Sequence, residues 1–190
     1  LTVKTLGFNV PPYLQPRLSR AQPGGNRMSE KRMVYISGAL SDMNDAERAR
    51  LRTFYEWVAA VCEEHGFGSY LPHKFSDPVR HRNKSPQEVD RIDRTAVTLS
   101  YLVIAYVGVP AFGVGIEIEM AFHANKPVVL LFEKERMEQR RVSRLVRGSP
   151  SVWHEIPFTD HEDAIRQLKE FFPAFLKDIR EQELPTPLSI

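Results

Sequence analysis

The chain has 190 residues, of which 42% are hydrophobic, which is enough for one buried core and too few for two. Its formal net charge is +2, but residues 1–32 hold six basic residues against Glu30, a net of +5, so the remainder carries −3. A mildly acidic globular part argues against a nucleic-acid-binding face. No run reaches the ~18 apolar residues of a membrane span, and the start lacks the apolar stretch of a signal peptide. We therefore expect a cytoplasmic protein with no membrane partner.

Composition also sets the expected domain limits. Residues 1–30 combine several prolines with the pair Gly24–Gly25 and show no lasting periodicity, so we expect an extended or disordered arm. One domain should cover residues 31–182, followed by a tail at 183–190. Cys62 is the only cysteine, and the six histidines show no metal-binding spacing. We therefore expect neither a disulfide nor a bound metal, and no cofactor.

The first half of the domain alternates strand and helix. Residues 33–36 predict a short strand, and residues 45–64 a helix that stops at His65–Gly66. A second strand is expected at 68–71, followed by a polar loop to residue 84.

A strong helix start follows this loop. Ser85, Pro86 and Glu88 form a capping box with proline at the first helical position. At 100° per residue the apolar side chains of this helix share one arc. These are Val89, Ile92, Ala96, Val97 and Leu99. Asp93 falls inside the arc, so a carboxylate is expected on the buried side.

The stretch 101–132 organises the rest of the chain. It predicts a buried strand, a glycine-rich loop at 108–115, a helix and a second buried strand. A basic helix at 134–147, a strand at 152–157 and a helix at 161–181 complete the pattern. Alternating strands and helices with right-handed crossovers predict an α/β fold. We expect an open five-stranded parallel sheet, flavodoxin- or Rossmann-like, in the order 2-1-3-4-5, with helices on both faces.

The glycine loop lies at the carboxyl end of the predicted sheet, where α/β proteins bind ligands. Gly113 and Gly115 directly precede the helix, and backbone N–H groups at such a place suit a phosphate. The spacing fits neither GxGxxG nor GxxxxGK[ST], so a dinucleotide site and a P-loop are unsupported. A simple tight turn explains these glycines equally well.

Two carboxylates flank the central strand. Glu117 projects between Ala121 and Ala124, on the side that packs against the sheet, whereas Glu119 projects with His123 toward solvent. This favours Glu117 as the functional acid. Asp93 is the candidate to join it, and the alternative is that it serves as a structural hydrogen-bond acceptor. Two carboxylates converging on one pocket suit glycosidic chemistry, with one as nucleophile and one as proton donor.

These residues resemble the nucleoside 2-deoxyribosyltransferase family, closest to its 2'-deoxynucleoside 5'-phosphate N-hydrolases and the related CMP and hydroxymethyl-CMP hydrolases. Four pieces carry the resemblance, which covers nearly all of 33–180. They are the run Val34-Tyr35-Ile36-Ser37-Gly38, Asp93, the run Gly113-Val114-Gly115-Ile116-Glu117, and the run Arg144-Leu145-Val146-Arg147-Gly148.

The resemblance implies cleavage of the N-glycosidic bond of a nucleoside monophosphate. Glu117 matches the nucleophile, Asp93 the second acid, and Tyr35 an active-site tyrosine. Gly38, Gly113 and Gly115 match the phosphate-binding region, and Ser41 is a further candidate for binding the phosphate. Ser143 matches a serine that reaches the phosphate in the neighbouring subunit, which implies a homodimer with shared active sites. His73 is a candidate contact for the base.

Two positions depart from the resemblance. Ala39 and Ala111 stand where relatives carry serine hydroxyls for the phosphate, so Ser41, Arg48 or the basic helix would have to replace them, or the substrate lacks the phosphate. We expect a nucleoside 5'-monophosphate N-glycosidase that yields free base and (deoxy)ribose 5-phosphate. The alternatives are a nucleoside 2-deoxyribosyltransferase and a catalytically silent nucleotide-binding module. Related enzymes also act on ribonucleotides, so the 2' substituent stays open.

Overall fold

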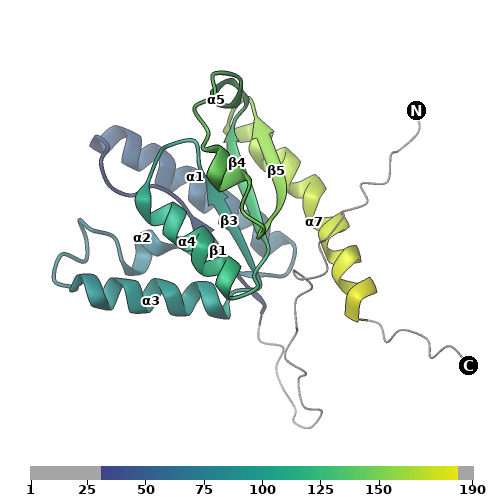
Figure 1. The fold of residues 1–190 in the computed structure, drawn as a ribbon, viewed down its shortest axis with the longest axis horizontal. Helices are drawn as coiled ribbons and strands as arrows, with labels where there is room; N and C mark the ends of the chain where they lie inside the picture. Colours follow the sequence, from purple (N-terminus) through teal and green to yellow (C-terminus); the bar gives the residue numbers. More distant parts are fainter. Residues whose placement is uncertain (1–30, 184–190) are drawn as a thin grey trace, which may run out of the picture.

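A five-stranded, fully parallel sheet forms the centre of the computed structural model, which describes residues 31–183. The strands are β1 (Met33–Ser37), β2 (Gly68–Tyr70), β3 (Leu102–Tyr106), β4 (Val128–Glu133) and β5 (Val152–Phe158). Their order is β2-β1-β3-β4-β5, which confirms the predicted α/β class and topology (Figure 1). The arm predicted at 1–30 and residues 184–190 of the predicted tail lie outside the described residues.

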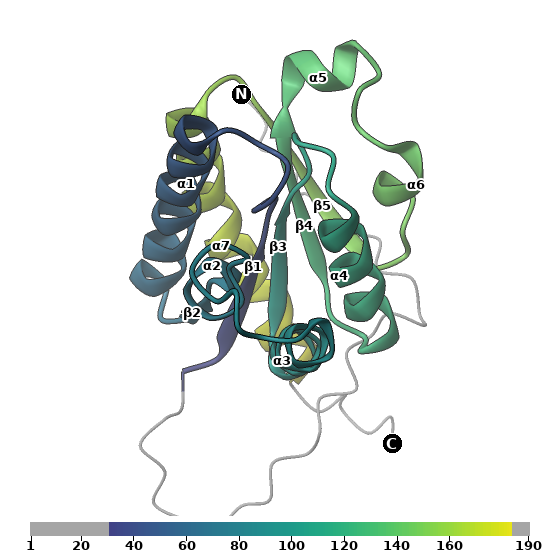
Figure 2. The same cartoon turned by 90° about the vertical axis from the view of Figure 1, so that its left-hand side faces the viewer.

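Helices cover both faces of the sheet (Figure 2). α1 (Asp45–Glu64) and α7 (His161–Glu183) pack on one face, and α3 (Pro86–Leu99) and α4 (Phe112–His123) on the other. Each face has its own apolar cluster because successive side chains of a strand point to opposite sides. On β1, Val34 and Ile36 join the α1–α7 cluster, whereas Tyr35 joins the α3–α4 cluster. The odd-numbered residues of β1 therefore face α3 and α4.

Local signals place the helix ends where the sequence predicts them. The Asn44 side chain caps α1 by accepting a hydrogen bond of 2.9 Å from the Glu47 backbone N–H. Gly66 follows the C-terminus of α1 with a φ of 85°, a conformation that favours glycine. The capping box of Ser85 and Glu88 is present at the start of α3. These contacts satisfy backbone N–H and carbonyl groups that a helix end leaves unpaired.

Three predictions of secondary structure are wrong. The loop expected after β2 begins with a short helix, α2 (Pro72–Phe75), which is too short to show a periodic pattern. The single basic helix expected at 134–147 is two helices, α5 (Lys134–Glu138) and α6 (Arg144–Arg147). Arg140 breaks the run with a φ of 57°, and Ser143 caps α6 by accepting a hydrogen bond from Val146.

The start of α4 also differs from the prediction. The helix begins at Phe112, so Gly113 and Gly115 lie in its first turn rather than in the preceding loop. On α3, Leu99 was expected on the buried arc but is 75% exposed. It lies about 200° around the helix from the fully buried Val97, at the edge of the predicted arc.

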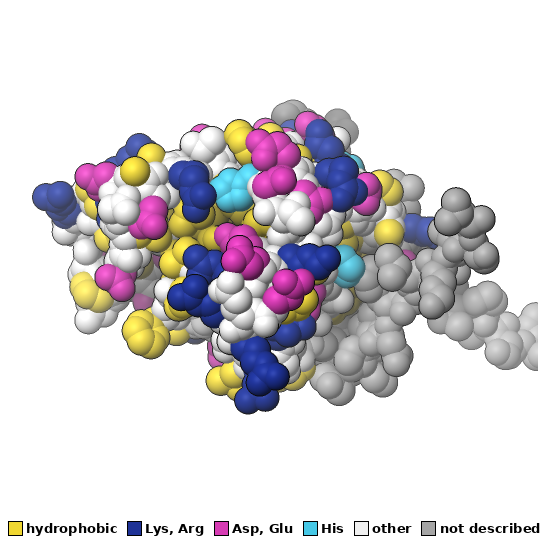
Figure 3. Space-filling view, turned by 90° about the horizontal axis from the view of Figure 1, so that it is seen from above, with side chains coloured by type: hydrophobic (Ala, Val, Ile, Leu, Met, Phe, Trp, Pro, Cys, Tyr) yellow, Lys and Arg dark blue, Asp and Glu magenta, His cyan; other side chains and the backbone are white. Residues whose placement is uncertain are grey.

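Proteins of the α/β class bind ligands at the carboxyl ends of the strands of their sheet. Figure 3 looks down on these strand ends and shows basic and acidic side chains interspersed around a central hydrophobic area, with no continuous basic stripe. Within residues 31–183, no helix combines the length and apolar character needed to cross a bilayer.

Candidate functional site

Glu117 lies at the centre of a polar cluster between β1, α3 and α4. The phenol of Tyr35 donates a hydrogen bond of 2.7 Å to its Oε1, and the hydroxyl of Ser37 donates one to its Oε2. Tyr35 and Ser37 are both fully buried. They reach the same carboxylate because residues two apart on a strand point to the same face. Each oxygen of Glu117 therefore has its own hydroxyl donor.

The two glutamates of α4 differ as the sequence predicts. Glu117 is half-buried against the sheet, whereas the Glu119 side chain is 62% exposed and lies 3.2 Å from Nε2 of the exposed His123. Their positions on the helix, 200° apart, set this difference. Glu119 is therefore a solvated surface residue.

Burial gives Glu117 an unusual protonation behaviour. Loss of hydration raises its pKa from the ordinary 4.5 to about 7, with a smaller contribution from the negative charge of Asp93. The hydrogen bonds from Ser37 and Tyr35 act in the opposite direction, because they stabilise the carboxylate. The same burial, together with the negative charge of Glu117, raises the pKa of Tyr35 and keeps this phenol protonated as a donor. A carboxyl with a pKa near the working pH is typical of catalytic groups.

Asp93 projects from α3 toward the same cluster. It is 8% exposed and accepts hydrogen bonds from the Ser76 hydroxyl at 3.1 Å and, more weakly, from the Tyr70 phenol at 3.4 Å. Burial raises the pKa of Asp93, and the two hydrogen bonds lower it by less. The predicted burial of this carboxyl is confirmed.

A ladder of three aromatic rings borders the two carboxyls. Tyr35 stacks on Tyr70 with ring centroids 5.3 Å apart, and Tyr70 stacks on Phe75 at 4.7 Å. Phe75 is 46% exposed, so the ladder runs from the buried phenol beside Glu117 to the surface at α2. The stacking holds both tyrosine hydroxyls in place beside the acids they contact.

An ion pair anchors the segment that follows α2. Asp77 is fully buried, pairs closely with Arg52 of α1 and accepts backbone hydrogen bonds from Val79 at 2.8 Å and Arg80 at 3.0 Å. This anchor lies one residue after Ser76 and so positions the hydroxyl that contacts Asp93. The ion pair thus holds the segment that carries Ser76 against α1.

The three glycines predicted at the site serve different structural purposes. A Cβ on Gly38 would overlap the ring of Tyr55, so this glycine is required for packing. A Cβ on Gly113 or Gly115 would meet nothing within 4 Å. Packing therefore does not explain the glycines of α4, although glycine weakens a helix.

The other residues predicted for substrate binding are Ser41, Ser143, Arg48 and His73. Ser41 is exposed in the loop after β1, and Ser143 caps α6. Arg48 donates to the backbone carbonyls of Leu40 and Met43 and so holds this loop. His73 is buried on the α1 side, where its ring packs near Tyr55 and its Nε2 lies 3.4 Å from Glu56.

Three residues of the cluster were not predicted as site residues: Ser37, Tyr70 and Ser76. Ser37 carried a usable signal, because it shares the strand face of Tyr35. Tyr70 and Ser76 carried none, because their contact with Asp93 depends on how the segment 71–85 folds back.

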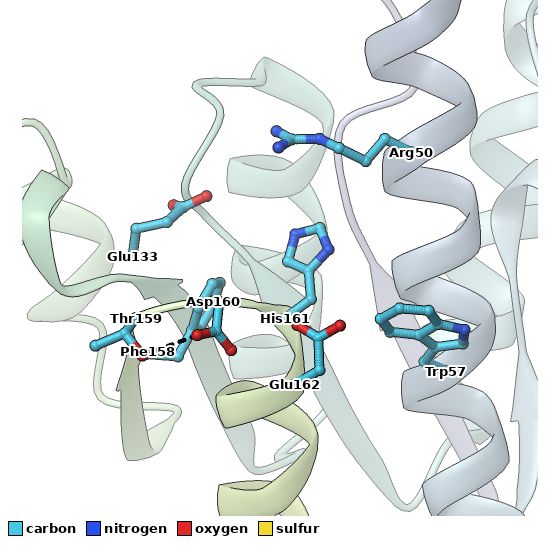
Figure 4. Close-up of a pocket in the computed structure, with 8 residues that line it drawn as sticks. All are labelled: Arg50, Trp57, Glu133, Phe158, Thr159, Asp160, His161 and Glu162. Carbon is cyan, nitrogen blue, oxygen red and sulfur yellow. Dashed lines mark hydrogen bonds between the residues drawn. The ribbon is translucent and has the colours of Figure 1, made fainter.

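A separate hollow of about 320 Å³ opens at the carboxyl ends of β4 and β5 (Figure 4). Arg50, Trp57, Glu133 and His161 are among the residues that line it, and they come from α1, β4 and the start of α7. It lies on the α1–α7 side of the sheet, and neither Glu117 nor Asp93 lines it. We therefore assign the site to the carboxylate cluster, where buried acids and hydroxyl donors converge. In the part of the chain that the structure describes, no three metal-ligating side chains gather in one place.

Together the fold and the cluster define an α/β protein with a two-carboxyl site beside the first strand of a 2-1-3-4-5 sheet. No profile of a known protein family matches the sequence. It is 30% identical, over 144 residues, to a protein of Thermofilum pendens provisionally named 2'-deoxynucleoside 5'-phosphate N-hydrolase 1. The alignment covers 74% of this chain and 94% of that protein.

Solved structures show the same fold. The CMP N-glycosidase BcmB of Clostridium botulinum superimposes with a TM-score of 0.55 at 22% identity, covering 74% of this chain and 99% of that one. The solution structure of BlsM gives a TM-score of 0.59 at 24% identity, with coverage of 84% and 98%. The Thermofilum pendens protein is 30% identical to this chain over 94% of its own length. This chain therefore belongs to the 2'-deoxynucleoside 5'-phosphate N-hydrolase family. This confirms the resemblance found in the sequence.

Proposed function

We propose that this protein hydrolyses the N-glycosidic bond of a nucleoside 5'-monophosphate, giving the free base and (deoxy)ribose 5-phosphate. The observation that carries the proposal is Glu117: a half-buried carboxylate with a hydroxyl donor on each oxygen, set beside a second buried acid. The names of the relative and of BcmB support the same class of reaction. The protein would act in the cytoplasm, without a metal or cofactor.

Glu117 is the nucleophile in this mechanism. One of its oxygens bonds to the anomeric carbon while the carbon–nitrogen bond breaks and its electron pair goes to the base. Asp93 supplies the proton that the departing base needs. Water then attacks the anomeric carbon and gives its proton to the Asp93 carboxylate, and the electron pair of the ester bond returns to Glu117. Both carboxyls end in their starting states.

The raised pKa values suit these two roles. A pKa of about 7 leaves Glu117 substantially ionised at neutral pH, as a nucleophile requires. Burial raises the pKa of Asp93, which favours the protonated form that a general acid requires. Tyr35 stays protonated and fixes the orientation of Glu117.

The phosphate is proposed to bind near Gly38, Ser41 and the bare first turn of α4 at Gly113 and Gly115. Ala39 and Ala111 offer no hydroxyl, and Arg48 already holds two carbonyls of its own loop. Ser41 and Ser143 are thus the hydroxyl donors left among the predicted residues. For the base, His73 stays a prediction, although its ring packs on the α1 side.

A homodimer with shared active sites is part of the proposal. Three large apolar side chains on α4 and α6 are exposed: Phe112 at 96%, Ile116 at 53% and Leu145 at 88%. Exposed apolar side chains of this size suit an interface. A second copy seated there would bring the α6 of one subunit, with Ser143 at its start, toward the site of the other.

The direct test incubates the purified protein with CMP, dCMP, dUMP and dGMP and looks for free base by chromatography. Glu117→Ala should abolish release, whereas Glu119→Ala, two residues away on the same helix and solvent-exposed, should leave it unchanged. No base from any nucleotide, or equal release by Glu117→Ala, would defeat the proposal. An added acceptor base that yields a new nucleoside would identify a deoxyribosyltransferase instead. Tight nucleotide binding without product would identify a silent binding module.

A further inference from the structure

The hydroxyl of Ser37, at the carboxyl end of β1, has no role in the mechanism above. We propose that Ser37 is a positioning residue that holds Oε2 of Glu117 and favours its ionised form, so that the nucleophile works at neutral pH. The proposal rests on the proposed function and extends it to a residue outside the predicted site.

The geometry assigns one hydroxyl to each oxygen of the nucleophile. Tyr35 donates to Oε1 at 2.7 Å, and Ser37 donates to Oε2. Two donors on different oxygens fix the rotation of the carboxylate plane, which a single donor does not. Both donors are on the same strand, so the sheet itself holds their spacing.

The surroundings of Ser37 give its hydroxyl no other purpose. It is fully buried, it pairs in the sheet with Ala105, and the neighbouring cluster on this face is apolar, with Val103 and Val114 among its members. A hydroxyl buried among apolar side chains destabilises the folded state unless it is hydrogen-bonded. Alanine would fill nearly the same volume without this cost. Among residues 31–183, the hydrogen bond to Glu117 is the contact that accounts for a serine here.

Electrostatics shows what the bond does. The titratable groups that interact electrostatically with Glu117 are Tyr35 of β1, Asp93 of α3, Tyr70 of β2 and Tyr55 of α1. All are phenols or acids, so no cation among them offsets the buried charge. Burial raises the pKa of Glu117, and the hydroxyls of Ser37 and Tyr35 are the groups that lower it again. Without Ser37, the carboxyl would hold its proton to higher pH.

Loss of the Ser37 hydroxyl should therefore act mainly below the pKa of Glu117. Loss of a hydrogen bond to a charged group corresponds to a pKa of that group higher by about one to two units. In Ser37→Ala, the acid limb of the kcat profile should move up by that amount. Activity at pH 6 should fall by about 10- to 100-fold, and activity at pH 9 by much less. A merely structural serine would lower activity equally at all pH values.

The experiment compares pH–rate profiles of the wild type, Ser37→Ala, Ser37→Cys and Ser100→Ala. Ser37→Cys has a side chain of similar size that donates a weaker hydrogen bond. The acid limb of its pH–rate profile should therefore lie between those of the wild type and Ser37→Ala. Ser100 is equally buried but donates to the Val97 carbonyl at the end of α3, so its removal should leave the limb unchanged. An acid limb of Ser37→Ala within 0.3 units of the wild type, a margin of about 0.4 kcal/mol, would overturn the proposal.

A second readout does not depend on turnover. The side-chain carboxyl carbon of Glu117 can be titrated by ¹³C NMR, with Glu117→Gln identifying its signal. Its midpoint should be higher in Ser37→Ala than in the wild type, and an equal midpoint contradicts the proposal even if the protein hydrolyses nothing. Conversely, if the wild type is active but the acid limb of Ser37→Ala does not move, the proposed role of Ser37 is wrong and the proposed function stands. Should Ser37→Ala fail to fold, Ser37→Cys decides both measurements.

Discussion

The phenol of Tyr35 donates a 2.7 Å hydrogen bond to Glu117, although 82 residues separate the two in the chain. β1 carries the donor and α4 carries the acceptor, and they meet because β1 and β3 are neighbours in the sheet. The contact places a strand residue and a helix residue in one site. It also makes the ionisation of Glu117 depend on residues of the first strand.

Tyr35→Phe should reduce turnover at neutral pH by about 10- to 100-fold, because Oε1 loses a hydrogen bond to a charged group. The ring can keep its stacking on Tyr70, so the melting temperature should change little. Steady-state kinetics at pH 7 and calorimetry measure the two effects. The matched control is Tyr106→Phe, which loses a comparable 2.6 Å bond to Glu133 outside the cluster and should keep full activity. Equal losses in the two variants would contradict the prediction.

Glu117→Gln should make the protein more stable at pH 8 while removing its activity. The pKa of Glu117 is higher in the folded state, about 7, than its ordinary 4.5, so the folded protein binds the extra proton between these values. The contribution of Glu117 to the free energy of unfolding is therefore fully present below pH 4.5 and is lost as the pH rises through 7. The difference of 2.5 units corresponds to about 3 kcal/mol at pH 8. Urea unfolding at pH 5 and pH 8 tests it. A stability difference between variant and wild type that does not change with pH would refute it.

Asp93→Asn should lower kcat by about 10²- to 10⁴-fold, because asparagine occupies the same volume but cannot give a proton to the departing base. The loss should be greatest for bases that leave poorly without protonation, so the rates of several nucleotides are compared. Asp90→Asn is the control on the same helix, since Asp90 is exposed and pairs with Arg94 at 2.8 Å. Similar losses for all bases would point to a role in positioning the sugar instead.

Gly115→Ala should stabilise the fold and weaken catalysis. A Cβ there meets no atom within 4 Å, and alanine is about 0.5–1 kcal/mol better than glycine inside a helix. If the bare backbone is needed for the phosphate, KM for the nucleotide should rise. Gly38→Ala is the contrasting variant, since its Cβ would overlap the Tyr55 ring and destabilise the protein. A more stable Gly115→Ala with an unchanged KM would mean that this glycine is structural only.

Periodicity and caps are local properties, so the elements they specify could be read from the chain alone. The capping box at Ser85 and the stop at Gly66 place helix ends correctly, and continuous apolar runs reveal the buried parallel strands. The contrast between Glu117 and Glu119 follows from helix geometry alone. For the same reason Asp93 was expected on a buried face, and it is buried.

Contacts between distant segments required the folded chain. Ser37 contacts Glu117 because α4 packs beside β1, and Ser76 contacts Asp93 next to the point where Asp77 and Arg52 anchor the segment after α2. A sequence pattern states which face of an element is apolar, whereas the free energy of a buried polar group depends on the partner that the tertiary fold provides. Both acids and Tyr35 were therefore predicted from the sequence, whereas the contacts of Ser37, Tyr70 and Ser76 were found only in the folded chain.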